Sequence, residues 1–186
     1  MKQGKLLIIS GPSAGVGKDT ILRMFLEKHP DWYQPTSTTT RPLRPGEKEE
    51  KRMNSVTTET FKKWQTEDKF LETDFHAGHW YGTLREPVEK LLSEGQNVVL
   101  RIDVNGSMQI KNQMPEAVTV FIEAESPEAL EVRIRERGSE TEEQIQSRLK
   151  LAKKELRYKK FFDHRVVNPQ NRPEEALGAV ERATGF

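Results

Sequence analysis

The most informative stretch of this sequence is GPSAGVGKDT, residues 11–20, because of the segments on either side of it. An apolar run at residues 6–9 precedes it, and apolar residues from Lys18 to His29 recur with the spacing of a helix. A glycine-rich turn between a buried strand and a helix is typical of a phosphate-binding loop, since its backbone N–H groups can face one anion at the positive end of the helix. The sequence therefore predicts a nucleotide site in which Lys18 reaches the β- and γ-phosphates, rather than a plain turn with a solvated lysine.

This loop departs from the usual phosphate-loop pattern in two ways. Five residues instead of four separate Gly11 from Gly17, so we expect the backbone to bulge, most simply at residues 14–15. The lysine is followed by Asp19 and then Thr20, and an acid at this position can share in binding Mg²⁺ but also repels a triphosphate. The expected nucleotide contacts are Gly11, Ser13, Gly15, Val16, Gly17, Lys18, Asp19 and Thr20, and the last two are the expected metal ligands.

The rest of the chain alternates short apolar runs with helical patterns. Strands are expected at residues 98–103, 118–122 and 165–167. Helices are expected at residues 87–95 and 173–182, two more are expected to start at residues 106 and 126, and a long one is expected to end at about residue 160. Such alternation implies a parallel sheet with helices on both faces, which is a three-layer α/β fold. Residues 36–84 interrupt this pattern, with a polar first half, a short helix around Phe61 and two strands around a turn at residues 77–78, so we expect an insertion there.

Length and composition narrow the possible functions. The chain has 186 residues, with 30 Lys and Arg against 29 Asp and Glu and no cysteine. Mixed charge gives no reason to expect binding to nucleic acid or acidic lipids, and the lack of cysteine excludes disulfides, thiolate metal sites and thiol nucleophiles. No apolar stretch approaches the roughly 20 residues of a membrane helix, and the first residues lead directly into a strand. We therefore expect one soluble, cytoplasmic domain.

A second stretch, STTTRPLRPGE at residues 37–47, carries two arginines three positions apart, Arg41 and Arg44. Guanidinium groups bind phosphate oxygens bidentately, and the neighbouring hydroxyl groups supply further donors. On this pattern alone, a second anion site and an exposed charged loop are equal alternatives.

Together these motifs resemble those of the guanylate kinases over nearly the whole chain. The shared segments are the GPS start of the phosphate loop, STTTRPLRPGE, FLE at 70–72, WYGT at 80–83, IDVNG at 102–106 and RGSETEE at 137–143. The resemblance implies a phosphate-loop NTPase fold of the nucleoside monophosphate kinase type. It also implies a single domain with a core at residues 1–35, 85–132 and 149–186, a GMP-binding insertion at 36–84 and a lid at 133–148.

The same resemblance implies Mg²⁺-dependent transfer of a phosphoryl group from ATP to GMP, and to dGMP, by a monomer or homodimer. The implied catalytic residues are Lys18, Arg41, Arg133 and Arg148. Arg137 and Asn168 would join the phosphate loop in binding ATP, with Asn168 near adenine. The implied GMP contacts are Ser37, Arg41, Arg44, Glu47, Glu72, Tyr81, Thr83 and Asp103.

The residue types suit the reading of guanine. Guanine presents N1–H and an amino group as adjacent donors, so the carboxylate of Glu72 can accept both, whereas adenine would leave it partly unpaired. Thr83 can donate to O6, and Asp103 can accept from the amino group. Without the family, the alternatives are an outward-facing Glu72, a core position for Tyr81 and a solvated, salt-bridged helix face for the arginines at 133–137.

Two further positions differ from the residues usual in that family. Met53 stands where a tyrosine donates to the acceptor phosphate, and Arg101 stands where an acid helps to organise Mg²⁺. Methionine cannot donate such a hydrogen bond, and arginine cannot ligate a metal. Because Asp19 is an unexpected acid at a metal-facing position, we expect a charge exchange in which Asp19 and Arg101 lie within ion-pairing distance.

Two other functions remain open from the sequence. Ribose 1,5-bisphosphate phosphokinases look similar and can have Gly-Lys-Asp in this loop. A guanylate-kinase-like module that binds without catalysing is favoured by the altered loop, Met53 and Arg101. Glu72 and Asp103 favour a guanine nucleotide, and Lys18 with the lid arginines favours catalysis, so we expect an active GMP kinase.

Overall fold

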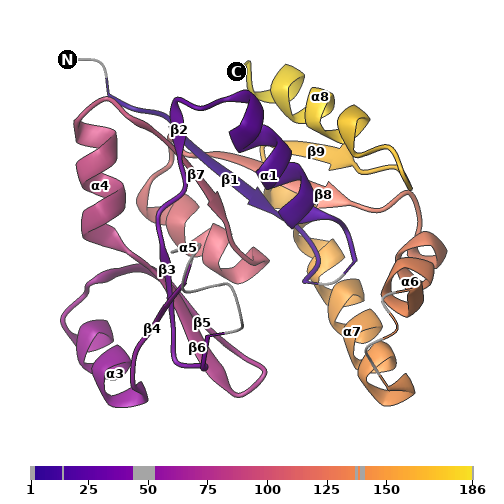
Figure 1. Cartoon of the computed structure of the whole chain (residues 1–186), viewed down its shortest axis with the longest axis horizontal. Coiled ribbons are helices and arrows are strands. Elements are labelled where there is room, and N and C mark those ends of the chain that lie inside the picture. The colour runs from indigo at the N-terminus through magenta and orange to yellow at the C-terminus, as the bar shows by residue number, and fades with distance from the viewer. Residues whose placement is uncertain (1–2, 14, 44–52, 137, 139–140, 186) are drawn as a thin grey trace. The chain divides into compact units, whose positions relative to one another are not determined.

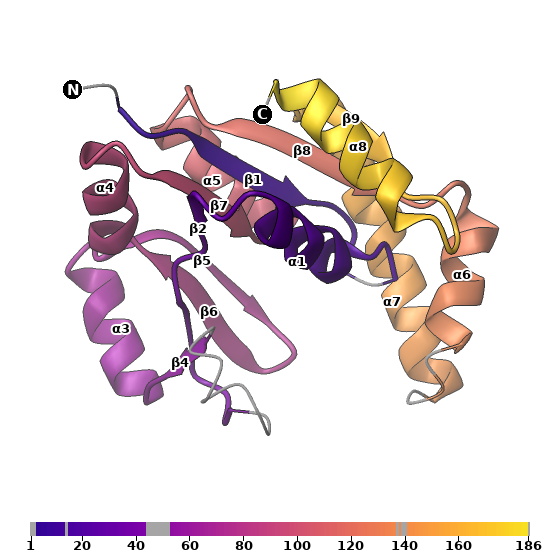
Figure 2. The same ribbon diagram turned by 45° about the horizontal axis from the view of Figure 1, so that its top comes forward.

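The computed structural model describes residues 3–13, 15–43, 53–136, 138 and 141–185. The chain forms two compact units, each assembled from separate stretches of sequence (Figures 1 and 2). The first unit comprises Met1–Leu6, Asp31–Leu100 and Asn105–Ala117, and the second comprises Leu7–Pro30, Arg101–Val104 and Val118–Phe186. Within the described ranges, none of the helices is both long and apolar enough to cross a bilayer.

The second unit is built on three parallel strands in the order β1-β8-β9. They are β1 (Leu6–Ser10), which enters this unit at Leu7, β8 (Val118–Glu123) and β9 (His164–Val167). Pairing places Ile8 opposite Thr119 and Phe121 opposite Arg165. Strand β1 is buried along its whole length, which explains its uninterrupted apolar sequence.

Helices of the second unit follow each of these strands. They are α1 (Lys18–Lys28), α6 (Pro127–Glu136), α7 (Glu142–Glu155), the 3₁₀ helix η1 (Leu156–Phe161) and α8 (Pro173–Thr184). Helix α8 packs against both α1 and β9 (Figure 1). Thr141 and Gln144 form a capping box that fixes the start of α7.

The first unit contains a parallel strand pair and a second, four-stranded sheet. In the pair, β2 (Trp32–Tyr33) lies beside β7 (Asn97–Arg101). The second sheet has the order β4-β3-β6-β5. Its strands are β3 (Ser37–Thr39), β4 (Met53–Ser55), β5 (Phe70–His76) and β6 (His79–Leu84), and the helices of this unit are α3 (Thr58–Thr66), α4 (Arg85–Ser93) and α5 (Val104–Gln113).

One face of the four-stranded sheet is aromatic. The ring of Phe61, from α3, lies 4.4 Å from that of Phe70 and 5.9 Å from that of Trp80. The ring of Phe75 lies 5.0 Å from that of Trp80. A β-bulge between Phe70 and Glu72 shifts the alternation of β5, so that Glu72 and Asp74 project from the face opposite the rings.

The predicted α/β class with parallel strands is confirmed, and the differences concern short or polar elements. The strand expected to run to residue 103 ends at Arg101, and the helix expected from residue 106 begins at Val104. The helix expected to reach residue 160 ends at Glu155 and continues as the tighter η1. The sequence pattern also missed β2, β3 and β4, because strands of two or three mostly polar residues have no hydrophobic periodicity and form only through pairing with their neighbours.

Candidate active site

The loop between β1 and α1 closes on its own lysine. Lys18 is the first residue of α1, and its ammonium group donates hydrogen bonds to the carbonyl oxygen of Gly11, at 3.0 Å, and to that of Pro12. Gly15 has a φ of 70°, a left-handed conformation that agrees with a bulge at this point of the loop. Ala14 lies outside the described residues. The amide groups at the start of α1 have no partners within the helix, so they and Lys18 can meet an anion together.

Asn168 supports this loop from the end of β9. Its side-chain amide donates to the carbonyl oxygen of Val16 at 2.9 Å, and its backbone N–H donates to that of Glu123 at 2.8 Å. A Cβ on Gly17 would lie 2.4 Å from the Asn168 amide nitrogen, and the φ of Gly17 is 81°. Glycine is therefore required at position 17 both by space and by backbone conformation.

Glu155, at the end of α7, holds the loop through a contact that the sequence did not suggest. Its carboxylate accepts a hydrogen bond from the backbone N–H of Ser13, at 2.9 Å, and another from the Ser13 hydroxyl group. The residue belongs to a helix rich in charged side chains, so nothing in the pattern distinguished it from solvated neighbours. The carboxylate of Glu155 is thus bound to the loop at Ser13.

Asp19 and Arg101 form the ion pair expected from the sequence. The Nε atom of Arg101 lies 2.9 Å from Oδ1 of Asp19, and the two side chains are 40% and 78% exposed. An exposed pair of this kind contributes only about 0–1 kcal/mol to stability. Its main effect is therefore on the distribution of charge beside the loop.

The charges around Lys18 change its ionisation. Its pKa is lowered from the ordinary value of 10.5 to about 8, first by burial and then by Arg101, while Glu155, Asp19 and Asp103 oppose the shift. A phosphate anion in the loop would act in the same direction as these carboxylates, so binding of a nucleotide would favour the ammonium form of the lysine.

Of the arginines expected in the lid, Arg133 is held by the chain itself. Its guanidinium group lies 2.5 Å from a carboxylate oxygen of Glu125, donates to the side chain of Gln170 at 2.7 Å and donates to the carbonyl oxygen of Asn168 at 2.8 Å. Arg148 lies on the exposed surface of α7. Arg133 would have to release these contacts before it could bind a phosphate.

Strand register in the first unit places most of the expected acceptor residues on one face of the four-stranded sheet. Ser37 of β3 lies opposite Thr83 of β6, which lies opposite Glu72 of β5. The next row on the same face consists of Thr39, Tyr81 and Asp74. A polar surface with a fixed order of side chains thus lies behind the aromatic face.

Glu72 is buried in this face and has a defined hydrogen-bond donor. The hydroxyl group of Thr83 donates to its Oε1 atom at 2.7 Å. A Cβ on Gly106 would lie 2.7 Å from its Oε2 atom, so a glycine in α5 makes the space that the carboxylate occupies. The expected placement of Glu72 and Thr83 in one site is consistent with this contact, whereas no role for Gly106 was predicted.

Two glutamines of α5 fix the main chain of β5 around Glu72. Gln109 accepts from the N–H of Thr73 at 3.1 Å and donates to its carbonyl oxygen at 3.0 Å. Gln113 donates to the carbonyl oxygen of Leu71 at 2.8 Å. These residues were also missed by the sequence analysis, because an amide on a helix surface carries no positional signal.

Arg41 follows β3, and its backbone is held by side chains of β3 and β4. Its N–H donates to the Thr39 hydroxyl group at 3.3 Å, and its carbonyl oxygen accepts from the Ser55 hydroxyl group at 2.8 Å. Met53 begins β4 and lies opposite Ser37. Met53, which cannot donate a hydrogen bond to the acceptor phosphate, therefore lies next to Ser37, which is expected to bind that phosphate.

The expected residues thus fall into two sets, one in each unit. The second unit holds the loop residues with Thr20, Asp103, Arg133, Arg148 and Asn168, and the first holds Ser37, Arg41, Glu72, Tyr81 and Thr83. Arg44, Glu47 and Arg137 lie outside the described residues. Each set offers cationic and hydrogen-bonding groups to an anion, and the first adds a buried carboxylate that can accept from two adjacent donors.

Comparisons with known proteins agree with these features. A family model described as guanylate kinase matches residues 3–184. The chain is 46% identical over 178 residues to a guanylate kinase of Gloeobacter violaceus, covering 96% of this chain and 85% of that protein. It is 42% identical over 179 residues to one of Clostridium perfringens, covering 96% and 82%. The crystal structure of guanylate kinase from Anaplasma phagocytophilum matches with a TM-score of 0.78 and 27% identity, covering 99% of this chain and 86% of that one.

Proposed function

Because the chain belongs to the guanylate kinase family, whose members phosphorylate GMP to GDP with ATP, we propose that the loop between β1 and α1 binds the phosphoryl donor and that the polar face of the four-stranded sheet binds the acceptor. The family match across residues 3–184 is the observation that carries the assignment. The chain is a nucleoside monophosphate kinase, and neither of the alternatives, a ribose 1,5-bisphosphate kinase or a module without catalysis, is supported.

The loop between β1 and α1 is the proposed ATP site. Its backbone N–H groups and the start of α1 would bind the triphosphate, and Lys18 would exchange the carbonyl oxygens of Gly11 and Pro12 for phosphate oxygens. Asn168, which already supports Val16, would lie beside adenine. The proposed contacts are Gly11, Ser13, Gly15, Val16, Gly17, Lys18, Asp19, Thr20, Arg137 and Asn168.

The donors beside this loop fit a magnesium ion that enters with ATP. Mg²⁺ takes oxygen ligands and usually combines one or two protein oxygens with phosphates and waters. The Thr20 hydroxyl group and the Asp19 carboxylate would hold it, and the ion would supply neutralisation of phosphate charge. Arg101 carries no ligand atom for a metal, but through its ion pair it keeps Asp19 at the loop.

The polar face of the four-stranded sheet is the proposed GMP site. Glu72 would accept hydrogen bonds from guanine N1–H and the amino group, and Asp103 would accept from the same amino group. Thr83 donates its single hydroxyl proton to Glu72 in the free protein, and would turn that proton to O6 once guanine supplies donors to Glu72. The proposed contacts to the GMP phosphate are Ser37, Arg41, Arg44, Glu47 and Tyr81.

The chemical step needs charge stabilisation more than covalent help. A GMP phosphate oxygen attacks the γ-phosphorus of ATP in line with the departing β-phosphate oxygen, and negative charge spreads over the transferring group. The proposed catalytic residues are Lys18, Arg41, Arg133 and Arg148. The arginines are always positively charged, and a bound phosphate would favour the charged form of Lys18. Closure of the arginines would also exclude water, which would otherwise accept the phosphoryl group.

We propose the same division of the chain that the sequence suggests, with a core at residues 1–35, 85–132 and 149–186, a GMP-binding insertion at 36–84 and a lid at 133–148. The lid would close by releasing Arg133 from Glu125. We further propose that the enzyme acts in the cytoplasm as a monomer or homodimer and also accepts dGMP.

A substrate panel tests the function directly. ADP release from Mg-ATP is measured against GMP, dGMP, AMP, CMP, UMP and ribose 1,5-bisphosphate. The proposal predicts turnover with GMP and dGMP, and at least about a hundredfold lower kcat/KM with AMP, because adenine lacks the N1–H donor. Turnover of the sugar bisphosphate alone, or GMP binding without ADP release, would contradict it.

A further inference from the structure

Two polar residues that neither the sequence nor the comparisons assign lie on the GMP face of the first unit. Asp74 and His76 follow Glu72 at intervals of two along β5, so all three side chains project from the same side of the strand. Asp74 also lies directly opposite Tyr81, the proposed phosphate ligand. These residues are thus part of the surface that GMP would contact.

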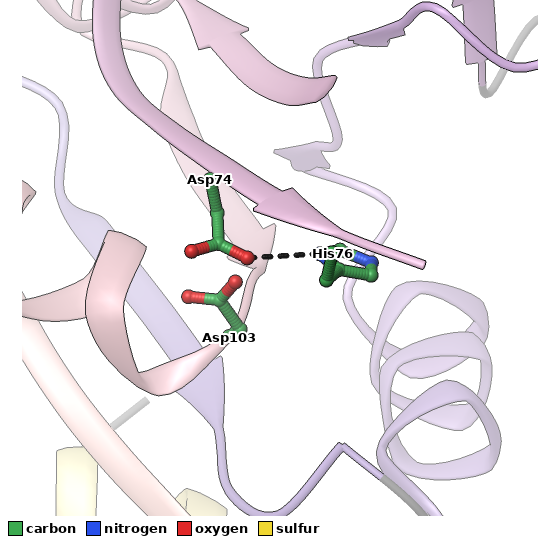
Figure 3. A group of neighbouring side chains, drawn as sticks. All are labelled: Asp74, His76 and Asp103. Carbon is green, nitrogen blue, oxygen red and sulfur yellow. Dashed lines mark hydrogen bonds and ion pairs between the residues drawn. The ribbon is translucent and has the colours of Figure 1, made fainter. Parts of the chain in front are cut away.

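Asp74 orients the imidazole ring of His76. Its Oδ2 atom lies 2.8 Å from Nδ1 of His76, and this hydrogen bond is drawn in Figure 3. The other carboxylate oxygen, Oδ1, accepts from the side chain of Asn105 at 3.4 Å. The His76 side chain is 51% exposed, whereas that of Asp74 is 19% exposed, so the more enclosed residue fixes the more exposed one.

His76 in turn stacks on Tyr81. The two ring centroids are 4.1 Å apart, and the ring planes are within 6° of parallel. A tyrosine on a half-exposed strand can otherwise change its side-chain rotamer, and a ring that covers one of its faces restricts that freedom. The contacts therefore form a chain from Asn105 through Asp74 and His76 to the Tyr81 ring, all within one unit.

We infer that Asp74 and His76 are positioning residues for the acceptor phosphate, which hold the Tyr81 ring so that its hydroxyl group is ready to donate to GMP. The inference rests on the proposed role of Tyr81 in binding that phosphate. The Tyr81 hydroxyl group matters more because Met53 offers no hydrogen-bond donor, so fewer hydroxyl groups remain to orient the phosphate. A ligand that finds its donor already oriented binds more tightly, since less side-chain freedom is lost on binding.

The contacts serve the site more than the fold. The aromatic cluster on the other face, including Phe61 and Trp80, already joins the hairpin to α3. His76 and Asp74 lie near the exposed tip of that hairpin, and their removal opens no buried cavity. Loss of the stack should therefore change GMP binding without unfolding the chain.

The test compares His76→Ala, His76→Phe and Tyr81→Phe by steady-state kinetics and thermal unfolding. His76→Ala should raise KM for GMP about fivefold, with KM for ATP and the unfolding temperature unchanged, because the Tyr81 donor remains and only its fixed orientation is lost. His76→Phe keeps a ring on Tyr81 and should restore most of the loss. His79→Ala, which removes the imidazole opposite His76 in the same hairpin, is the control and should have no effect.

A double variant of His76 and Tyr81 distinguishes the positioning role of His76 from the proposed role of Tyr81 in binding the phosphate. In a Tyr81→Phe background, His76→Ala should add little, since the hydroxyl group that it positions is gone. If Tyr81→Phe weakens GMP but His76→Ala does not, or if the two effects simply multiply, the positioning role is wrong while the assignment of Tyr81 stands. If Tyr81→Phe leaves GMP binding unchanged, both are wrong.

Tyrosine NMR provides a readout independent of activity. The chain has three tyrosines, so a tyrosine-labelled sample gives few ring signals. The Tyr81 ring protons, identified by their loss in Tyr81→Phe, should lie upfield through the ring current of His76 and should shift downfield in His76→Ala and in Asp74→Ala. Unmoved signals would show that the stack is absent in solution and would overturn the inference.

Discussion

The phosphate loop and the GMP face hold their polar groups in opposite ways. In the loop, Lys18 donates to carbonyl oxygens of its own loop and Ser13 donates to Glu155, and both contacts use groups that a phosphate would also need. On the GMP face, strand register and the Thr83 hydroxyl group fix Glu72 in a place that GMP can use without displacing its neighbours.

The difference follows from burial and charge. A buried carboxylate such as Glu72 always needs a hydrogen-bond donor, because leaving it unpaired is costly; Thr83 supplies one in the free protein and guanine would supply others in the complex. The loop donors instead hold partners that a nucleotide can replace. Ser13 is exposed, and the Lys18 ammonium, whose burial lowers its pKa, gains more from a phosphate anion than from neutral carbonyl oxygens. One region is therefore organised before its ligand arrives, and the other is organised by its ligand.

Removal of the loop cation should have the largest effect. Lys18→Ala should lower kcat by about a thousandfold, because a charge aimed at the transferring group is lost. Unfolding temperature should stay the same or rise, since burial of the ammonium opposes folding. Turnover assays and calorimetry measure both, with Lys28→Ala as the control on the same helix. Appreciable turnover in Lys18→Ala would contradict the assignment of the loop.

Because the GMP face is organised before its ligand binds, variants of this face should weaken the binding of GMP and leave that of ATP unchanged. Glu72→Ala should raise KM for GMP about a hundredfold and leave KM for ATP unchanged, because two hydrogen bonds to the base are lost. Gly106→Ala should act in the same direction, since its Cβ would displace the Glu72 carboxylate. Glu59→Ala, an exposed acid of α3, is the matched control. An equal loss for both substrates would mean that Glu72 supports the fold rather than the base.

The loop alone should respond to mildly alkaline pH. The lowered pKa of Lys18, about 8, means that most of the ammonium is lost by pH 9 in the free protein. Affinity for metal-free ATP, measured by calorimetry with EDTA, should therefore fall by up to about tenfold between pH 7 and 9, while affinity for GMP stays constant. The pH dependence should vanish in Lys18→Met. An ATP affinity that does not change with pH would show that the lysine stays charged throughout.

The same lowered pKa gives the pH dependence of stability a definite sign. Between about pH 8 and 10.5 the unfolded lysine holds a proton that the folded one has released, so this group makes the free energy of unfolding rise with pH. Below pH 8 both states are protonated and the contribution is constant. The contribution of Lys18 is the difference in the pH dependence of the free energy of unfolding between the wild type and Lys18→Met.

Glu155 tests whether the loop needs a temporary partner. Glu155→Ala should raise KM for ATP about fivefold with little change for GMP, because Ser13 loses the acceptor that fixes its N–H and hydroxyl groups. Glu155→Gln keeps one acceptor and should lose less. Glu143→Ala, an exposed acid of the same helix, is the control. Tighter ATP binding in Glu155→Ala would instead show that freeing the Ser13 donors from the carboxylate outweighs the loss of their fixed positions.

The smallest effect is expected from the Asp19–Arg101 pair. Asp19→Arg and Arg101→Asp should each raise KM for ATP about threefold, and the double reversal should recover part of that loss because the ion pair can reform. Unfolding temperatures should change little, since the pair is exposed. Additive losses in the double variant would argue that the two charges act independently.

Much of the fold could be predicted because its signals are local. The buried β1, the turn into α1 and the start of α6 at Pro127 all show in neighbouring residues, so their places were found within a residue or two. The Asp19–Arg101 pair was also predictable, because both residues depart from a known pattern at positions that face one metal. By contrast, β3 and β4 arise from pairing between distant segments and leave no local trace.

The missed site residues share a physical cause. Glu155, Gln109 and His76 act through contacts with residues distant in sequence, and each is a polar side chain in a segment where polar residues are ordinary. Gly106 matters only because of the space that Glu72 fills. Such roles depend on three-dimensional proximity, which neither periodicity nor spacing encodes.

A crystal structure with GMP and a non-hydrolysable ATP analogue would show both regions in their bound states. The Lys18 ammonium should leave the carbonyl oxygens of Gly11 and Pro12 for the β- and γ-phosphates, whereas Glu72 and Tyr81 should keep their present side-chain conformations and contact guanine and its phosphate. A GMP molecule bound away from Glu72, or a triphosphate that leaves Lys18 on its own loop, would contradict this prediction.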